Sequence, residues 1–229
     1  MFSNGDTNNT IRRQMTDLMI DPAAGVGGAG SSWSVAINNL YSNSPSTAPG
    51  SMGYCYHFPL YLKAGTAIGA RVQDVVGAAT VRLSIRVLGK PTRPELLKVG
   101  TKVQTLGATT ASTTGVAVTP GTAAVGSYSA SLGTLTNDAW WWQVGIGSND
   151  SGMTVCRYWF DIAHDATNKY ICARGISYGV SSTTEQSWKG AFGESQTICV
   201  APAGTDVYVR GTGNTTPDSS MTAIVYAVS

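Results

Sequence analysis

One short motif is written twice in this chain, and it constrains the fold more than any other feature. "AGTAIGAR" spans Ala64–Arg71, and "AGTDVYVR" spans Ala203–Arg210. The two copies begin 139 residues apart (203 − 64) and share the pattern Ala-Gly-Thr-x-(Ile/Val)-x-(Ala/Val)-Arg. Either a strand signature recurs by chance or the chain contains two copies of one domain, and the residues around each motif distinguish these readings.

Three further pairs of segments match in the same order along the chain. "RQMTDLMID" (13–21) and "RYWFDIAHD" (157–165) share Arg-x-x-x-Asp-(Leu/Ile)-x-x-Asp. "VAINNL" begins at Val35 and "ICARGI" at Ile171, and strand-like segments beginning at Ala79 and Ser219 close the two halves. Four ordered matches at a nearly constant offset predict a tandem duplication, with small differences in loops, where insertions are tolerated.

Alternation of apolar and polar residues within these segments predicts strands with one buried face. Ala-Gly-Thr reads as a turn that enters a strand, because Gly65 and Gly204 can adopt positive φ and Thr66 and Thr205 suit a strand start. Charged residues make up only 12 % of the chain, and small residues replace them. This composition favours strands over helical bundles. The prediction is an all-β chain with two tandem, jelly-roll-like β-sandwich domains.

The domain limits follow from the same matches. We expect a shorter first sandwich over residues 1–92, a linker over 93–115 and a second sandwich over 116–229. Pro91 and Pro94 make the linker semi-rigid, and "RPELLKVG" (93–100) reads as one short helical turn. The first copy begins close to the N-terminus, so it lacks a counterpart of the strands expected near 116–118 and in "AWWWQVGIGSND". Its incomplete sheet needs covering, by the second half or by another subunit.

Residues that could carry catalysis or bind a metal are few. The only histidines are His57 and His164, and no G-x-S-x-G elbow accompanies them. The four cysteines match no zinc motif and read as buried free thiols, with a Cys172–Cys199 bridge left open. We therefore expect no enzyme, no catalytic residue, no metal and no cofactor.

Repeated carboxylates are the strongest alternative to that expectation. Asp17 matches Asp161, and Asp21 matches Asp165. Paired carboxylates can serve glycoside hydrolysis or bind Ca²⁺. Their presence in both halves, at places set by the fold, favours structural ion pairs or turn caps instead. Arg13 and Arg157 are candidate partners for the charge, and Arg71 and Arg210 belong to the repeated motif.

Aromatic residues supply the candidate binding sites. Trp140, Trp141 and Trp142 are consecutive, so at least one must point away from its own core and pack on the other half or on a neighbouring subunit. Trp33, Tyr178 and Trp188 lie among small polar residues. Such aromatics stack on sugar rings, anchor a protein interface, or simply anchor a loop in the core.

Charge and hydropathy narrow the classes of partner. The net charge is +2 with no basic stripe, which argues against nucleic-acid binding. No apolar run approaches the roughly 20 residues that a membrane span needs. The polar N-terminus has no signal-peptide core. We expect a soluble protein made in a cytoplasm.

The stretch "YHFPLYLKAGTAIGARVQ" (56–73) resembles a signature of structural proteins of tailed bacteriophages, and "WWWQVGIGSND" and "YWFDIAHD" resemble strands that precede it there. The second half departs from this signature at "VYVRGTG". The resemblance implies a jelly-roll-like sandwich in a virion component, assembled in the host bacterial cytoplasm. Its expected partners are copies of itself and capsid, neck or tail proteins. We expect an exterior decoration or stabilising protein. The alternatives are a receptor-binding module for host glycans and, with little support, a polysaccharide or cell-wall hydrolase.

Overall fold

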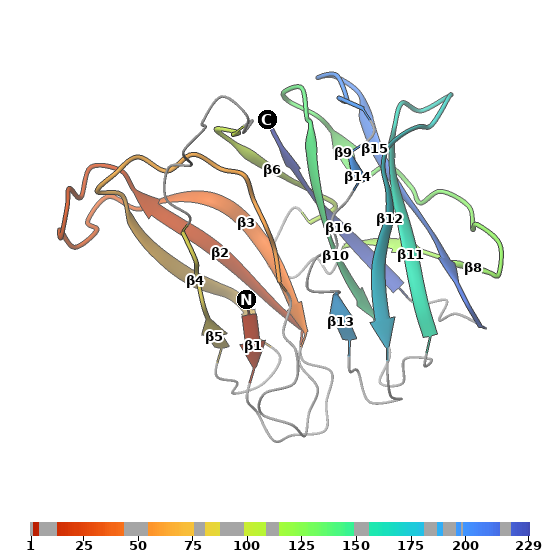
Figure 1. Cartoon of the computed structure of the whole chain (residues 1–229), viewed down its shortest axis with the longest axis horizontal. Helices are drawn as coiled ribbons and strands as arrows, with labels where there is room; N and C mark the ends of the chain where they lie inside the picture. Colours follow the sequence, from red (N-terminus) through yellow and green to blue (C-terminus); the bar gives the residue numbers. More distant parts are fainter. Residues whose placement is uncertain are drawn as a thin grey trace.

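The computed structural model describes residues 2–4, 13–43, 55–75, 81–87, 99–108, 115–148, 156–180, 187–189, 196–197, 199–215 and 221–229. Within these residues the regular elements are all strands, so the predicted all-β class is confirmed. The strands form four sheets, and three of them lie beside one another as layers (Figure 1). Residues 93–98 of the expected helical turn lie outside the described residues.

The first half builds a three-stranded antiparallel sheet in the order β3-β2-β4. Its strands are β2 (Arg13–Asp21), β3 (Ser34–Asn43) and β4 (Ala67–Val75). The strand expected from Ala79 is short: β5 (Val81–Leu83) pairs only with β1 (Phe2–Asn4). The residues that follow it are exposed, with Val87 at 60 %, so this segment does not close the half as its counterpart does.

The second half contains a seven-stranded sheet centred on β11 (Cys156–His164). Its neighbours are β12 (Tyr170–Val180) and β15 (Asp206–Gly213). Two short strands, β13 (Ser187–Lys189) and β14 (Gln196–Thr197), pair with β12. Two more, β8 (Gly121–Thr122) and β9 (Gly133–Thr134), pair with the outer edge of β15.

A third sheet lies between these two in Figure 1. Its strands are β10 (Trp141–Ser148), β16 (Met221–Val228), β6 (Val103–Leu106) and β7 (Val116–Val118). All eight residues of β16 are buried, which requires cover on both faces of the strand. One hydrophobic cluster joins Met15, Ile37 and Leu40 of the first half to the core of the second, so the sheets share a core.

Strand registers repeat the sequence matches residue by residue. Thr16 pairs with Leu40 and Leu18 with Ile37, and the register shifts between them. In the second half Phe160 pairs with Ile176 and Ile162 with Ala173, with the shift at the same place. Across the other strand pair, Asp17 lies opposite Arg71 and Asp161 opposite Arg210. These equal registers support the tandem duplication, which stays an inference.

Residues 99–108 were expected in the linker, but part of them forms β6, which pairs with the edge of β16. Gly100 also forms a parallel bridge with Leu60, so this stretch touches both halves. The four residues of β6 are too few to show a strand period in the sequence. The division into domains 1–92 and 116–229 stays a prediction.

Candidate functional site

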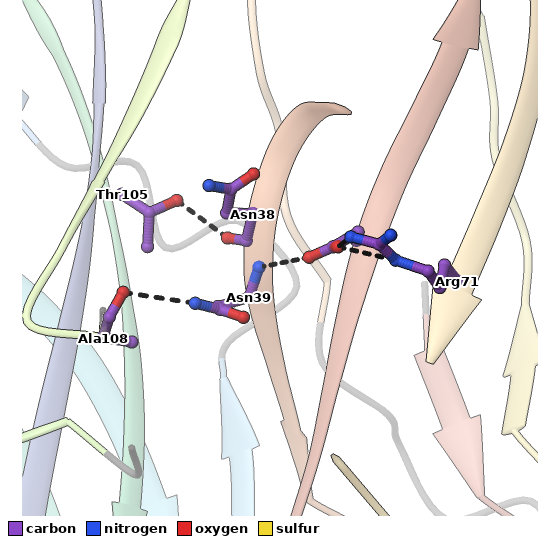
Figure 2. A network of polar contacts seen from close by, with 6 residues as sticks. Asn38, Asn39, Arg71, Thr105 and Ala108 are labelled. Atoms are coloured by element: carbon purple, nitrogen blue, oxygen red, sulfur yellow. Dashed lines mark hydrogen bonds and ion pairs between the residues drawn. The ribbon is translucent and has the colours of Figure 1, made fainter. Parts of the chain in front are cut away.

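Asp17 connects all three strands of the first-half sheet. Its side chain is 1 % exposed, and its Oδ2 accepts hydrogen bonds from Nη2 and Nε of Arg71 at 2.6 and 3.2 Å. Its Oδ1 accepts the backbone N–H of Asn39 at 3.0 Å (Figure 2). Asn39 stands at the register shift of β3 with a φ of 52°. One carboxylate therefore fixes β4 through a side chain and the β3 bulge through the backbone.

Asp161 makes the equivalent contacts in the second half. Its Oδ2 accepts hydrogen bonds from Nε and Nη2 of Arg210, both at 3.1 Å. Its Oδ1 accepts the N–H of Gly175 at 3.1 Å, and Gly175 has a φ of 69° at the matching bulge. The carboxylates form structural ion pairs, as expected, but the partners seen are Arg71 and Arg210. Of the two arginines first considered, Arg157 is exposed, and the side chain of Arg13 is not described.

A second pair of aspartates caps turns. Asp21 accepts backbone N–H groups of Ser31 and Ser32 at 2.8 Å each and of Ala23 at 3.0 Å. Asp165 accepts those of Asn168 and Thr167 at 2.7 and 2.9 Å. These donors lower the pKa of both carboxyls, led by Ser32 for Asp21 and by Asn168 for Asp165. The turn-cap interpretation of the repeat therefore agrees with the geometry.

The Ala-Gly-Thr motifs form matching turns. Gly65 and Gly204 adopt φ of 83° and 81°. Thr66 closes its turn with an N–H bond to the carbonyl of Lys63 at 3.1 Å, and Thr205 Oγ1 donates to the carbonyl of Pro202 at 2.7 Å. Both turns lead directly into the strands that carry Arg71 and Arg210. The motif therefore positions the arginine of each ion pair.

Hydrogen bonds and aromatic contacts join the two halves. Thr105 Oγ1 donates to the carbonyl of Asn38 at 2.7 Å, and Asn39 Nδ2 donates to that of Ala108 at 3.2 Å (Figure 2). Deeper in the junction, Tyr226 Oη accepts the N–H of Tyr41 at 2.8 Å and donates to the carbonyl of Asn39 at 2.7 Å. The first half therefore takes contacts from the second half, one of the two sources expected.

The tryptophan run divides as its spacing requires. Trp142 is fully buried, whereas Trp141 Nε1 donates to the carbonyl of His57 at 3.0 Å and its ring lies 6.0 Å from that of His57. Trp140 lies edge-on to Trp141, with ring centroids 6.5 Å apart. Trp141 therefore packs on the other half of the same chain.

The three loop aromatics do not gather in one place. Trp33 is 43 % exposed and precedes β3, where its ring packs against Gly30 and Gly69. Tyr178 and Trp188 lie on the adjacent strands β12 and β13, one register position apart, and their side chains are outside the described residues. Of these three, Trp33 is the one whose side chain the structure describes, and it is partly exposed.

Titratable groups elsewhere do not assemble into a catalytic arrangement in the described part of the chain. His164 is 7 % exposed with its ring 5.6 Å from that of Tyr170, and burial lowers its pKa. All four cysteines are free, so Cys172 and Cys199 are not bridged, and burial raises the pKa of both thiols. Among the described residues, no three His, Cys, Asp or Glu side chains lie close enough to hold a metal ion.

The described residues also contain no helix long and apolar enough to cross a membrane. No family model, curated protein or solved structure matches this chain.

Proposed function

We propose that this chain is a non-enzymatic structural component of a tailed-phage virion. Its role is that of an exterior protein that decorates or stabilises the particle in symmetric copies. The observation that carries the proposal is the structural role of the Ala-Gly-Thr motif, which resembles a signature of phage structural proteins. In each half the repeated aspartate accepts hydrogen bonds from the arginine of the motif and from one backbone N–H, so these charged groups hold strands in place.

The shared core is also suited to a particle component. β16 is buried on both faces, and the halves are joined by side chain-to-backbone bonds across the junction. Separating the halves would expose apolar surface and leave polar groups without their hydrogen-bond partners, and both cost free energy. Such a junction suits a protein whose two halves must stay together when the particle assembles.

Quantitative mass spectrometry of purified particles from the source phage tests the proposal. A copy number near that of the major capsid protein is the expected result for a head decoration protein. A much lower number would place the protein at the neck, tail or fibres. Absence of the protein from particles would overturn the virion role.

The second candidate is a receptor-binding module for host glycans, and the exposure of Trp33 favours it. An indole that is 43 % exposed beside glycines offers a face on which a sugar ring can stack. Binding of the purified protein to host cells or their glycans should then fall in Trp33→Ala and in Trp188→Ala. Unchanged binding in both variants would remove these aromatics from consideration.

A further inference from the structure

The outer edge of β15 shows how this fold covers the strand that carries the repeated arginine. Backbone N–H groups of Gly126, Ser129 and Leu132 donate to the carbonyls of Gly211, Val209 and Val207 at 2.8, 2.8 and 2.9 Å. These donors belong to an uncharged stretch, 121–135, that runs along the whole strand. Val209 is 0 % exposed as a result, and Gly211 is buried.

β4 is the counterpart of β15, but its outer edge is open in the described part of the chain. Ile68, Ala70 and Val72 match Val207, Val209 and Gly211 by the shared register with β2 and β11. β4 pairs only with β2, and no described residue donates a backbone hydrogen bond to those three carbonyls. Ala70 is exposed and Val72 is 39 % exposed.

This edge also lacks the devices that normally prevent pairing between proteins. Free edges usually carry proline, an inward-facing charge or a lysine. Residues 67–72 contain none of these, and their one charge, Arg71, is held by Asp17; the other charge of β4, Asp74, lies outside this stretch, one residue from the end of the strand. The three residues whose carbonyls lie on this open edge, Ile68, Ala70 and Val72, all have apolar side chains.

We propose that a second copy of this chain covers the edge, through antiparallel pairing of β4 with β4 about Ala70. In this register Ala70 lies opposite Ala70 of the second copy, and Ile68 lies opposite Val72. Arg71 lies opposite Gly69, so no like charges face each other. The two three-stranded sheets become one six-stranded sheet, and Ile68, Ala70 and Val72 of both copies form a continuous apolar stripe.

The pairing is self-complementary, as a two-fold interface must be. The register about Arg71 would instead set the two arginines opposite each other, at a cost in free energy. This inference deepens the proposed function, because it names the surface by which copies associate. It is tested in solution, without particles, so the two proposals fail separately.

Sedimentation velocity of the full chain over a dilution series in the micromolar range gives the first test. The wild-type chain should dimerise. Ala70→Glu places two carboxylates opposite each other and should weaken the dimer roughly tenfold or more. Ala130→Glu is the matched control, because Ala130 is also exposed but lies in the second half, and it should leave the dimer unchanged. A wild-type chain that stays monomeric, or a dimer indifferent to Ala70→Glu, would overturn the pairing.

Cysteine cross-linking tests the register. In an antiparallel hydrogen-bonded pair the Cα atoms lie about 5.5 Å apart, within disulfide range, so Ala70→Cys should cross-link to itself on oxidation. Two copies of Val72 would be four positions apart, roughly 14 Å, so Val72→Cys should not. Wild-type protein controls for the four native thiols. Self-cross-linking of Val72→Cys but not Ala70→Cys would refute this register.

Discussion

Asp17 and Asp161 make the same three contacts, but their surroundings differ. The Asp17 side chain is 1 % exposed beside an arginine that is 58 % exposed, whereas Asp161 and Arg210 are 14 % and 22 % exposed. Arg210 also lies over the ring of Tyr128, 4.8 Å from its centroid, in the segment that covers β15. In the first half the bond from the bulge to the carboxylate is buried at the junction with the second half. In the second half the equivalent bond, from Gly175 to Asp161, is open to water. The same device should therefore matter more in the half that has fewer strands.

The largest expected effect comes from removing Asp17, and removal of Asp161 is its comparison. Asp17→Ala leaves the buried N–H of Asn39 without this acceptor and should cost about 3 kcal/mol of unfolding free energy. Asp161→Ala frees the N–H of Gly175, which is exposed and can bond to water, so it should cost about 1 kcal/mol. Urea unfolding followed by circular dichroism measures both.

Asp17→Asn is the control for that comparison. It keeps an oxygen for the N–H of Asn39, and it loses the charge and the two hydrogen bonds with Arg71, whose side chain is largely exposed. Most of the stability should therefore return. Equal losses in Asp17→Ala and Asp161→Ala would show that burial of the first-half pair has no energetic consequence.

The next effect concerns the junction. Tyr226→Phe removes a hydroxyl that accepts the N–H of Tyr41 and donates to the carbonyl of Asn39, both buried, and should cost about 2 kcal/mol. Tyr56→Phe is the matched variant, because the bond that Tyr56 Oη donates to the carbonyl of Tyr41, at 2.6 Å, lies in a partly buried place. Its cost should be nearer 1 kcal/mol. A larger loss in Tyr56→Phe, by the same urea measurement, would contradict this ranking.

Local patterns account for what the sequence could predict here. The spacing of the two aspartates and the Ala-Gly-Thr turns lie within single segments, and so they led to the correct strands. The ion-pair partners required contacts between strands. Arg13 and Asp17 are four positions apart on one strand, roughly 14 Å, whereas Arg71 lies directly opposite Asp17 on the neighbouring strand. Tyr226 is a single tyrosine in the apolar run "MTAIVYAV", and nothing local indicates partners 185 and 187 residues away.

A difference of similar size is expected between the two motif glycines. Both adopt positive φ, so alanine at either position should cost about 1 kcal/mol in backbone strain. A Cβ at Gly65 would also lie 3.0 Å from backbone atoms of Gly25 and Val26, whereas one at Gly204 meets nothing within 4 Å. Gly65→Ala should therefore cost about 2 kcal/mol and Gly204→Ala about 1 kcal/mol. Thermal unfolding of the two variants side by side would refute the crowding at Gly65 if their midpoints coincide.

The smallest expected effect is a pH dependence of the unfolding free energy that differs between the two halves. Burial lowers the pKa of His164 below its ordinary value of 6.5, against the opposing influence of Asp165, so the fold favours the neutral imidazole. The stability that this provides is complete above pH 6.5 and is lost as pH falls from there toward the folded-state pKa. Asp21 and Asp165 act in a lower window: their pKa values are lowered from 3.8, so their contribution is present above that pH and is lost below it. Urea midpoints measured from neutral to acid pH test both assignments. His164→Gln should remove the fall in stability that begins at pH 6.5 and leave the fall below pH 3.8 unchanged. Asp21→Asn should reduce only the fall below pH 3.8, and only in part, because Asp165 also contributes to it. In the first half Ile20 occupies the position that matches His164, so that position does not titrate. A His164→Gln protein that still loses stability as pH falls from neutral would show that this loss does not come from the buried histidine.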